Sequence, residues 1–199
     1  MSKSQKNELD KKIVDGLERI TDIIKYSTWQ ICEPLKLSPI QVKILCYTLD
    51  NASTNIKISS LAEEFLVSRP TITDSIKALQ RRGFILIDKD PTDKRCSFIS
   101  LSAMGKLVAE NVSQYNQSIF NAIQDLDKAQ KESFFKNLID IIHSLQSKGF
   151  IPAQKMCFSC KYYSLKGKHH YCSLLEQNLK IEELKINCPE HQAIASSLN

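Results

Sequence analysis

The order of elements in the middle of the chain constrains the fold more than any other feature of the sequence. A short helix is expected over residues 58–66, and Ser68 is placed to cap a second helix that ends at Gly83. Residues 84–87 and 96–101 are then predicted to form two strands joined by a polar turn. Two short helices with a tight turn between them, followed by a hairpin, predict a winged helix-turn-helix.

Amphipathic helices are expected on both sides of this region. Their predicted ranges are 8–33, 38–49, 102–126 and 128–147. Ser38 and Ser102 are each placed to cap one of them, and Ser60 and Glu63 have the spacing of a capping box. The polar residues 51–57 are expected to form a loop. The apolar stripes of the outer helices exceed what one small lobe can bury, so a second copy is expected to cover them.

Basic side chains concentrate in the predicted helix-turn-helix and hairpin. The net charge of the whole chain is +5, which alone says little about its partners. Positions 68–106, however, hold eight basic side chains and only four acidic ones. A local excess of this kind favours a polyanion as the partner.

The second helix of the motif carries the residues expected to contact DNA. In a helix-turn-helix this helix lies in the major groove, with its N-terminal half nearest the base edges. The polar residues there are Ser68, Arg69, Thr71, Thr73 and Lys77. Arginine can pair with guanine, a threonine methyl can contact thymine, and Ser68 with nearby backbone N–H groups can hold a phosphate. An ordinary solvated amphipathic helix is the alternative interpretation.

The turn of the hairpin adds two basic residues, Lys94 and Arg95, which are expected to reach the minor groove or flanking phosphates. The sequence Asp93-Lys94-Arg95 belongs to a larger pattern that also includes residues 61–62, 67–73, 79–85 and 99–102 together with Gly105. This pattern resembles that of MarR-family transcriptional regulators. In order of elements, the resemblance covers residues 10–147.

The resemblance implies a winged-helix homodimer whose first and last helices, residues 8–33 and 102–147, interlock. It assigns the Arg95 position to the wing contact with DNA, and the Asp93 position to an ion pair that orients it. Such a dimer binds a pseudo-palindromic operator, with its two recognition helices in successive major grooves. The expected partners are double-stranded DNA, a second copy of the chain and a small-molecule effector.

Four of the seven cysteines cluster near the C-terminus: Cys157, Cys160, Cys172 and Cys188. Two residues separate the first pair, and intervals of eleven and fifteen residues follow. This spacing is typical of a metal site, and a segment of about 50 residues with little apolar surface needs such stabilisation. Zn²⁺ held by four thiolates is the first expectation. Histidines that can replace one thiolate are His169, His170 and His191.

Two other interpretations of this cluster remain open. An iron–sulfur cluster would make the tail a redox or iron sensor, and Cys157 with Cys160 can instead form a reactive dithiol. The remaining cysteines, Cys32, Cys46 and Cys96, are expected to be buried small hydrophobic residues.

These features together predict a mainly α fold of the α+β class. Its expected regions are an N-terminal dimerisation helix (1–37), a winged helix-turn-helix (38–105), C-terminal dimerisation helices (106–148) and a cysteine-rich metal-binding extension (149–199). The sequence has no phosphate-binding loop or nucleophile elbow, so an enzyme is not expected. It also lacks an apolar stretch of about 20 residues and a secretory signal, so a cytoplasmic protein with no membrane partner is expected. The alternative functions are a thiol or iron–sulfur redox-sensing regulator and a protein-binding winged helix without DNA.

Overall fold

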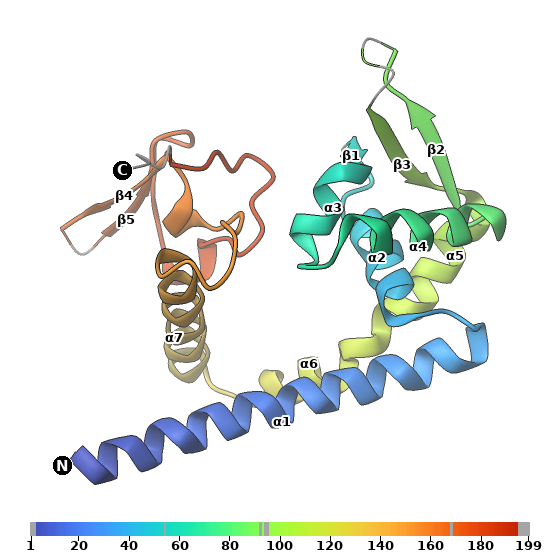
Figure 1. Ribbon diagram of the computed structural model, residues 1–199. Coiled ribbons are helices and arrows are strands. Elements are labelled where there is room, and N and C mark those ends of the chain that lie inside the picture. The colour runs from blue at the N-terminus through green and yellow to red at the C-terminus, as the bar shows by residue number, and fades with distance from the viewer. Residues whose placement is uncertain (1–2, 54, 92, 94–95, 168, 195–199) are drawn as a thin grey trace. The chain divides into compact units, whose positions relative to one another are not determined.

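The computed structural model describes residues 3–53, 55–91, 93, 96–167 and 169–194. The chain divides into two compact units, Met1–Ala122 and Ile123–Asn199, each with its own core. Figure 1 shows the hairpin of the first unit and the separate small sheet of the second. Within the described ranges, no helix is both long enough and apolar enough to cross a membrane.

The first unit is built mainly from helices. Its elements are α1 (Lys3–Leu35), α2 (Pro39–Asp50), β1 (Ile56–Lys57), α3 (Ile58–Glu64), α4 (Arg69–Arg81), β2 (Ile85–Lys89), β3 (Ser97–Leu101), α5 (Ala103–Val112) and the 3-10 helix η1 (Ser113–Asn116). The next helix, α6 (Gln117–Gln124), crosses the boundary between the units. The pair α3–α4 is followed by the antiparallel hairpin β2–β3, which confirms the predicted winged helix-turn-helix.

Serine caps set the starts of the flanking helices, as the sequence predicts. Ser38 and Gln41 form a reciprocal capping box on α2, in which each backbone N–H donates to the other side chain. Ser102 caps α5 by accepting the Gly105 N–H at 2.9 Å. Both starts depend only on local residues, which explains why the sequence reveals them.

Residues 51–57, predicted as a loop, contain a short strand. β1 pairs antiparallel with β3, with Ile56 opposite Ile99, and the sheet order is β1-β3-β2. Because the chain passes directly from β1 into α3, the predicted Ser60–Glu63 capping box is wrong. Ser60 instead donates its hydroxyl to the Lys57 carbonyl at 2.9 Å.

The single helix predicted over residues 102–126 is interrupted. α5 ends at Val112, and η1 winds the next four residues more tightly before α6 begins. Ser113 donates its hydroxyl to the Glu110 carbonyl at 2.8 Å, a local bond that competes with regular helix geometry. Tyr115 in η1 packs against the core of the unit and holds the interruption in place.

The core of the first unit lies among α2, α3, α4, α5 and the sheet. Its fully buried large side chains include Ile44, Leu45, Leu61, Ile72, Ile76, Leu79 and Ile85. Cys32 and Cys46 are buried as predicted, and burial raises the pKa of Cys46 to about 11. Cys96, the residue just before β3, is only half-buried, so the prediction that it is a core residue is wrong.

The second unit combines one long helix with a small antiparallel sheet. Its elements are α7 (Lys128–Ser147), η2 (Cys157–Ser159), β4 (Tyr163–Lys166), β5 (His169–Cys172), β6 (Gln177–Leu179) and η3 (Ile181–Glu183). The bounds of α7 confirm the helix predicted over residues 128–147. A small core joins Ile139 of α7 to Met156, Leu179 and Leu184. The last long helix therefore folds together with the cysteine-rich segment.

Candidate functional sites

A set of polar residues is exposed along α4 and its cap. The exposed residues are Ser68, Arg69, Thr71, Thr73 and Lys77. The residues of α4 that face the core are Ile72, Ser75, Ile76 and Leu79. The helix is therefore amphipathic, and all five residues predicted for the DNA-facing side are accessible to a partner.

Local hydrogen bonds fix the start of α4. Ser68 Oγ accepts the Thr71 backbone N–H at 3.2 Å and lies 2.7 Å from Thr71 Oγ1. Thr73 donates its hydroxyl to the Arg69 carbonyl at 3.0 Å. Because its hydroxyl hydrogen is used within the helix, Thr73 has its methyl group to offer an apolar partner. The long Arg69 and Lys77 side chains supply the positive charge of this surface.

Polar contacts hold the turn of the hairpin. The Asp93 backbone N–H donates to Asp90 Oδ1 at 3.2 Å, and the Cys96 thiol donates to Asp93 Oδ2 at 3.4 Å. The hydrogen bond to Asp93 raises the pKa of Cys96. Lys94 and Arg95 lie outside the described residues, so the Asp93–Arg95 ion pair stays a prediction.

Arg82, to which no sequence pattern points, holds the end of α4. Directly after α4, its guanidinium donates to the carbonyl of Leu35 at 2.9 Å and to that of Lys36 at 3.0 Å. It also lies over the Phe84 ring, 4.7 Å from the centroid. Arg82 thus ties the end of α4 to the end of α1. Local sequence patterns cannot signal this contact, because its partners are 46 and 47 residues away.

Hydrogen bonds at the base of the hairpin join it to α4 and α5. Gly83 ends α4 with a φ of +72°, a left-handed conformation that favours glycine. The Ser102 hydroxyl donates to the Gly83 carbonyl at 2.6 Å, and the Ser102 N–H donates to the Phe84 carbonyl at 3.0 Å. These bonds fix the direction of the hairpin relative to α4.

The four cysteines of the predicted metal cluster lie on adjacent segments of the second unit. Cys157 and Cys160 bracket η2, and the Cys160 N–H donates to the Cys157 carbonyl at 3.0 Å. Cys172 lies in β5 opposite Tyr163 of β4, whose N–H donates to the Cys160 carbonyl at 3.0 Å. Cys188 lies in the segment after η3.

All four thiols are free, and they influence one another electrostatically. Burial raises the pKa of Cys157, and the charges of Cys188, Cys172 and Cys160 raise it further. In the described ranges, no three His, Cys, Asp or Glu side chains meet closely enough, as they stand, to hold a metal ion. The fold therefore brings the cysteines into one neighbourhood without closing a ligand set.

The histidines predicted as alternative ligands have other surroundings. His191 Nε2 lies 2.9 Å from Ser159 Oγ, and His170 Nδ1 lies 2.7 Å from the Tyr163 hydroxyl. Burial lowers the pKa of both imidazoles, which favours their neutral forms. His169 is exposed at the start of β5.

A broad apolar face of α1 is exposed. Its large side chains that are at least 38% exposed are Leu9, Ile13, Val14, Ile20, Ile23, Tyr26 and Trp29. Toward its C-terminal end α1 contributes buried residues, among them Thr28 and Cys32. An uncovered apolar stripe of this length is typical of an interface with another chain.

The sequence model of the MarR family matches residues 37–97 of this chain, from the start of α2 to the start of β3. The HTH-type transcriptional regulator SarZ of Staphylococcus epidermidis is 28% identical over 101 residues, which cover 51% of this chain and 64% of SarZ. The chain thus spans somewhat less than two thirds of the length of the curated relatives it matches.

Solved structures show the same fold at lower identity. Staphylococcus aureus MepR in its DNA-binding conformation has a TM-score of 0.63 and 20% identity, covering 67% of this chain and 98% of MepR. The MepR–DNA complex has a TM-score of 0.58 and 21% identity, and the match covers 65% of this chain and 95% of that chain. The transcriptional regulator BldR from Sulfolobus solfataricus has a TM-score of 0.55 and 19% identity, and the match covers 72% of this chain and 99% of BldR. These likenesses support the winged helix architecture.

Proposed function

We propose that this chain is a transcriptional regulator of the MarR type that binds double-stranded DNA as a homodimer. The observation that carries the proposal is the exposed polar face of α4, with Arg69 and Lys77 on it, in a winged helix-turn-helix. SarZ is named a transcriptional regulator and MepR has been solved with DNA, which supports extending this activity to the chain. The proposed activity is binding, and it needs no catalytic residue.

In this proposal α4 enters the major groove by its N-terminal half. Arg69 pairs with a guanine, a contact that contributes about 1–3 kcal/mol of discrimination between bases. Thr73 places its methyl group against a thymine, and Lys77 contributes a phosphate contact. Ser68 and Thr71 lie at the start of the helix, where backbone N–H groups and the helix dipole favour a phosphate.

The wing supplies the second contact. Lys94 and Arg95 are proposed to reach the minor groove or the flanking phosphates, and Asp93 to orient Arg95. The hydrogen bonds of Ser102 at the base of the hairpin support this arrangement, because they set the direction of the wing relative to α4.

A second copy of the chain is proposed to cover α1. The exposed apolar residues of this helix support an interface formed by residues 8–33 together with residues 102–147. A two-fold dimer presents two copies of α4 to successive major grooves, so its operator is pseudo-palindromic.

An effector is proposed to act on the spacing of the two recognition helices. A concavity of about 390 Å³ in the first unit supports a small-molecule effector, since ligand sites span about 300–1,000 Å³. Residues lining it include Thr48, Ile56, Phe98, Ser100 and Lys106. The metal or redox state of the cysteine cluster is proposed as a second factor that alters the spacing of the two recognition helices.

A direct test starts from double-stranded genomic fragments selected on the purified full-length chain. The selected duplex is then titrated with each variant at fixed salt. We expect Arg69→Ala to weaken binding about tenfold or more, because a base contact is lost. Lys77→Ala and Arg95→Ala are each expected to reduce the slope of log affinity against log salt by about one, because each removes a phosphate contact.

Lys166→Ala serves as the matched control, because Lys166 is an exposed lysine of β4 in the second unit, outside both the helix-turn-helix and the ranges proposed for dimerisation. Its affinity is expected to equal that of the unmodified chain. The proposal fails if no duplex is selected, or if Arg69→Ala and the control bind equally well. If no duplex is selected, a protein-binding winged helix becomes the better interpretation.

A further inference from the structure

We infer that Cys157, Cys160, Cys172 and Cys188 form a structural Zn²⁺ site that holds the C-terminal segment folded against α7. The match to the MarR family ends at residue 97, well before these cysteines, so the inference rests on the second unit itself. It is also independent of the proposed DNA binding.

The turn at Cys157 and Cys160 has the backbone that a two-thiol knuckle needs. A single 3-10 turn links the two residues, closed by the 3.0 Å bond from the Cys160 N–H to the Cys157 carbonyl. The Lys185 N–H donates to Cys157 Sγ at 3.2 Å. A backbone donor aimed at sulfur stabilises a thiolate, which is the form that binds metal.

The other two cysteines are brought to this turn by separate backbone bonds. Cys172 is opposite Tyr163, whose N–H is bonded to the Cys160 carbonyl. On the other side, the Cys157 N–H donates to the Lys185 carbonyl at 3.1 Å and the Cys188 N–H donates to the Lys155 carbonyl at 2.8 Å. Three chain segments thus converge on one place, each carrying one or two of the thiols.

The core of this segment is too small to fold it unaided. Between residues 149 and 194, the buried large apolar side chains among those described are Met156, Leu179 and Leu184. Several others are at least 43% exposed: Phe150, Leu165, Leu174, Leu175, Ile186 and Ile194. Segments of about 50 residues with so little buried surface depend on disulfides or a metal. Because the four cysteines are free thiols, a bound metal is the remaining way to stabilise the segment.

The donor set fits zinc, and zinc binding would complete it. Four thiolates form a closed tetrahedral zinc site, whereas His191 and His170 already have protein partners. Since no three donors of the described part of the chain yet meet at one point, the ion has to draw the thiols together. Metal binding and the final packing of the segment are therefore coupled.

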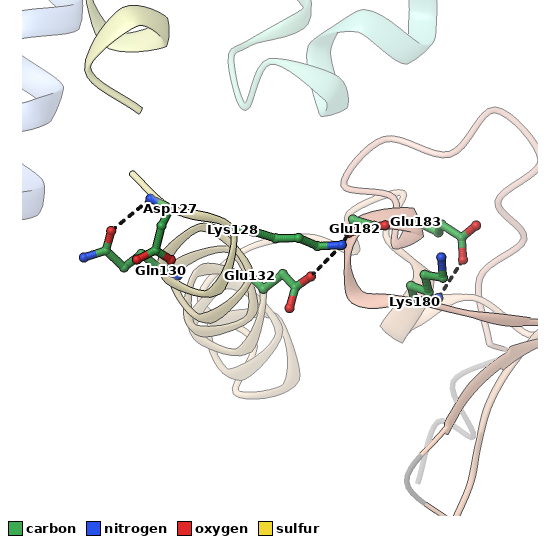
Figure 2. Close-up of polar contacts among 7 residues, drawn as sticks. All are labelled: Asp127, Lys128, Gln130, Glu132, Lys180, Glu182 and Glu183. Atoms are coloured by element: carbon green, nitrogen blue, oxygen red, sulfur yellow. Dashed lines mark hydrogen bonds and ion pairs between the residues drawn. The ribbon is translucent and has the colours of Figure 1, made fainter. Parts of the chain in front are cut away.

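The segment is joined to α7 by both apolar and charged contacts. Ile139 of α7 is buried with Met156, Leu179 and Leu184. Figure 2 shows Lys128, at the start of α7, reaching both Glu182 of η3 and Glu132 of its own helix. The Lys128 Nζ lies 3.2 Å from the Glu182 carboxylate. A zinc ion that orders the segment therefore also orders the surface on which α7 packs.

The test uses the full-length chain, purified without added chelator, and elemental analysis. We expect one zinc ion per chain in the unmodified protein and a background amount in Cys188→Ser. Cys96→Ser is the matched control, because Cys96 is a partly exposed cysteine of the first unit, and its zinc content is expected to stay at one. Equal metal content in the two variants would overturn the assignment.

A measurement on the unmodified chain covers the case in which Cys188→Ser fails to fold. Replacing the metal with Co²⁺ is expected to give the visible and near-ultraviolet bands of a tetrahedral tetrathiolate. Chelation is then expected to release four additional thiols to a thiol reagent. Iron with acid-labile sulfide, a metal-free protein, or fewer than four released thiols would each contradict a four-thiolate zinc site.

Discussion

Gly105, in the first turn of α5, occupies a place where the chain passes very close to itself. A Cβ at this position would lie 1.8 Å from the Phe84 carbonyl oxygen, which also accepts the Ser102 N–H. Its own N–H is bonded to the Ser102 hydroxyl. Only a hydrogen fits between α5 and the base of the wing, so this glycine decides how closely the two elements pack.

We therefore expect Gly105→Ala to lower the free energy of unfolding by about 1–3 kcal/mol, since backbone has to move to admit the methyl group. Gly16→Ala is the matched control. Gly16 lies within α1 with nothing near its would-be Cβ, and alanine there is expected to stabilise by about 0.5–1 kcal/mol. Urea unfolding followed by circular dichroism compares the two. Equal changes in the free energy of unfolding for Gly105→Ala and Gly16→Ala would contradict the close approach of Gly105 to the Phe84 carbonyl.

At the scale of elements, the orientation of α4 depends on the end of α1. Arg82 bonds two carbonyl oxygens there, at Leu35 and Lys36, and the positive φ of Lys36 turns the chain toward α2. The carbonyls at a helix C-terminus have no partners within the helix, and a guanidinium satisfies two of them at once. The proposed dimerisation helix and the proposed recognition helix are thus joined by one side chain.

Arg82→Gln is expected to cost about 1 kcal/mol of stability, because an exposed charge-assisted contact is screened by water. It is also expected to weaken binding of the selected duplex without changing its base preference, since α4 keeps its own contact residues. Arg81→Gln is the control for stability and should change it by less than about 0.5 kcal/mol. If Arg82→Gln changes neither the stability nor the affinity for the selected duplex, Arg82 does not position α4.

The elements that the sequence predicts correctly are those with local causes. Ser38, Ser68 and Ser102 cap helices through residues three positions away, and Gly83 ends α4 by its own conformation. β1 and the contacts of Arg82 depend on partners far along the chain, so no local pattern reports them. At η1 the local bond from Ser113 to Glu110 accompanies the interruption of the helix, but the interruption also depends on the packing of Tyr115 against the core, which no local pattern reports. The spacing of the cysteines predicts their convergence and not the position of each thiol.

At the scale of the whole molecule, the exposed face of α1 predicts the assembly state. We expect the double change Ile13→Glu with Ile20→Glu to turn a dimer into a monomer, because two charges would be buried without partners. Analytical ultracentrifugation measures the mass directly. The control is Lys11→Glu with Lys12→Glu, which places the same new residues on exposed polar positions of the same helix. A monomeric unmodified chain would contradict the proposed dimer.

The helix α7 has two apolar faces with different surroundings. Ile139 is enclosed by the cysteine-rich segment, while Phe134, Ile141 and Leu145 are each about 40% exposed and lie in the region proposed for dimerisation. In the proposed zinc-bound dimer, loss of the ion or oxidation of the four thiols would uncover Ile139 and so disturb the dimerisation face of the same helix. Zinc starvation or oxidative stress would then alter gene expression through the proposed dimer, with no change to any residue proposed to contact DNA.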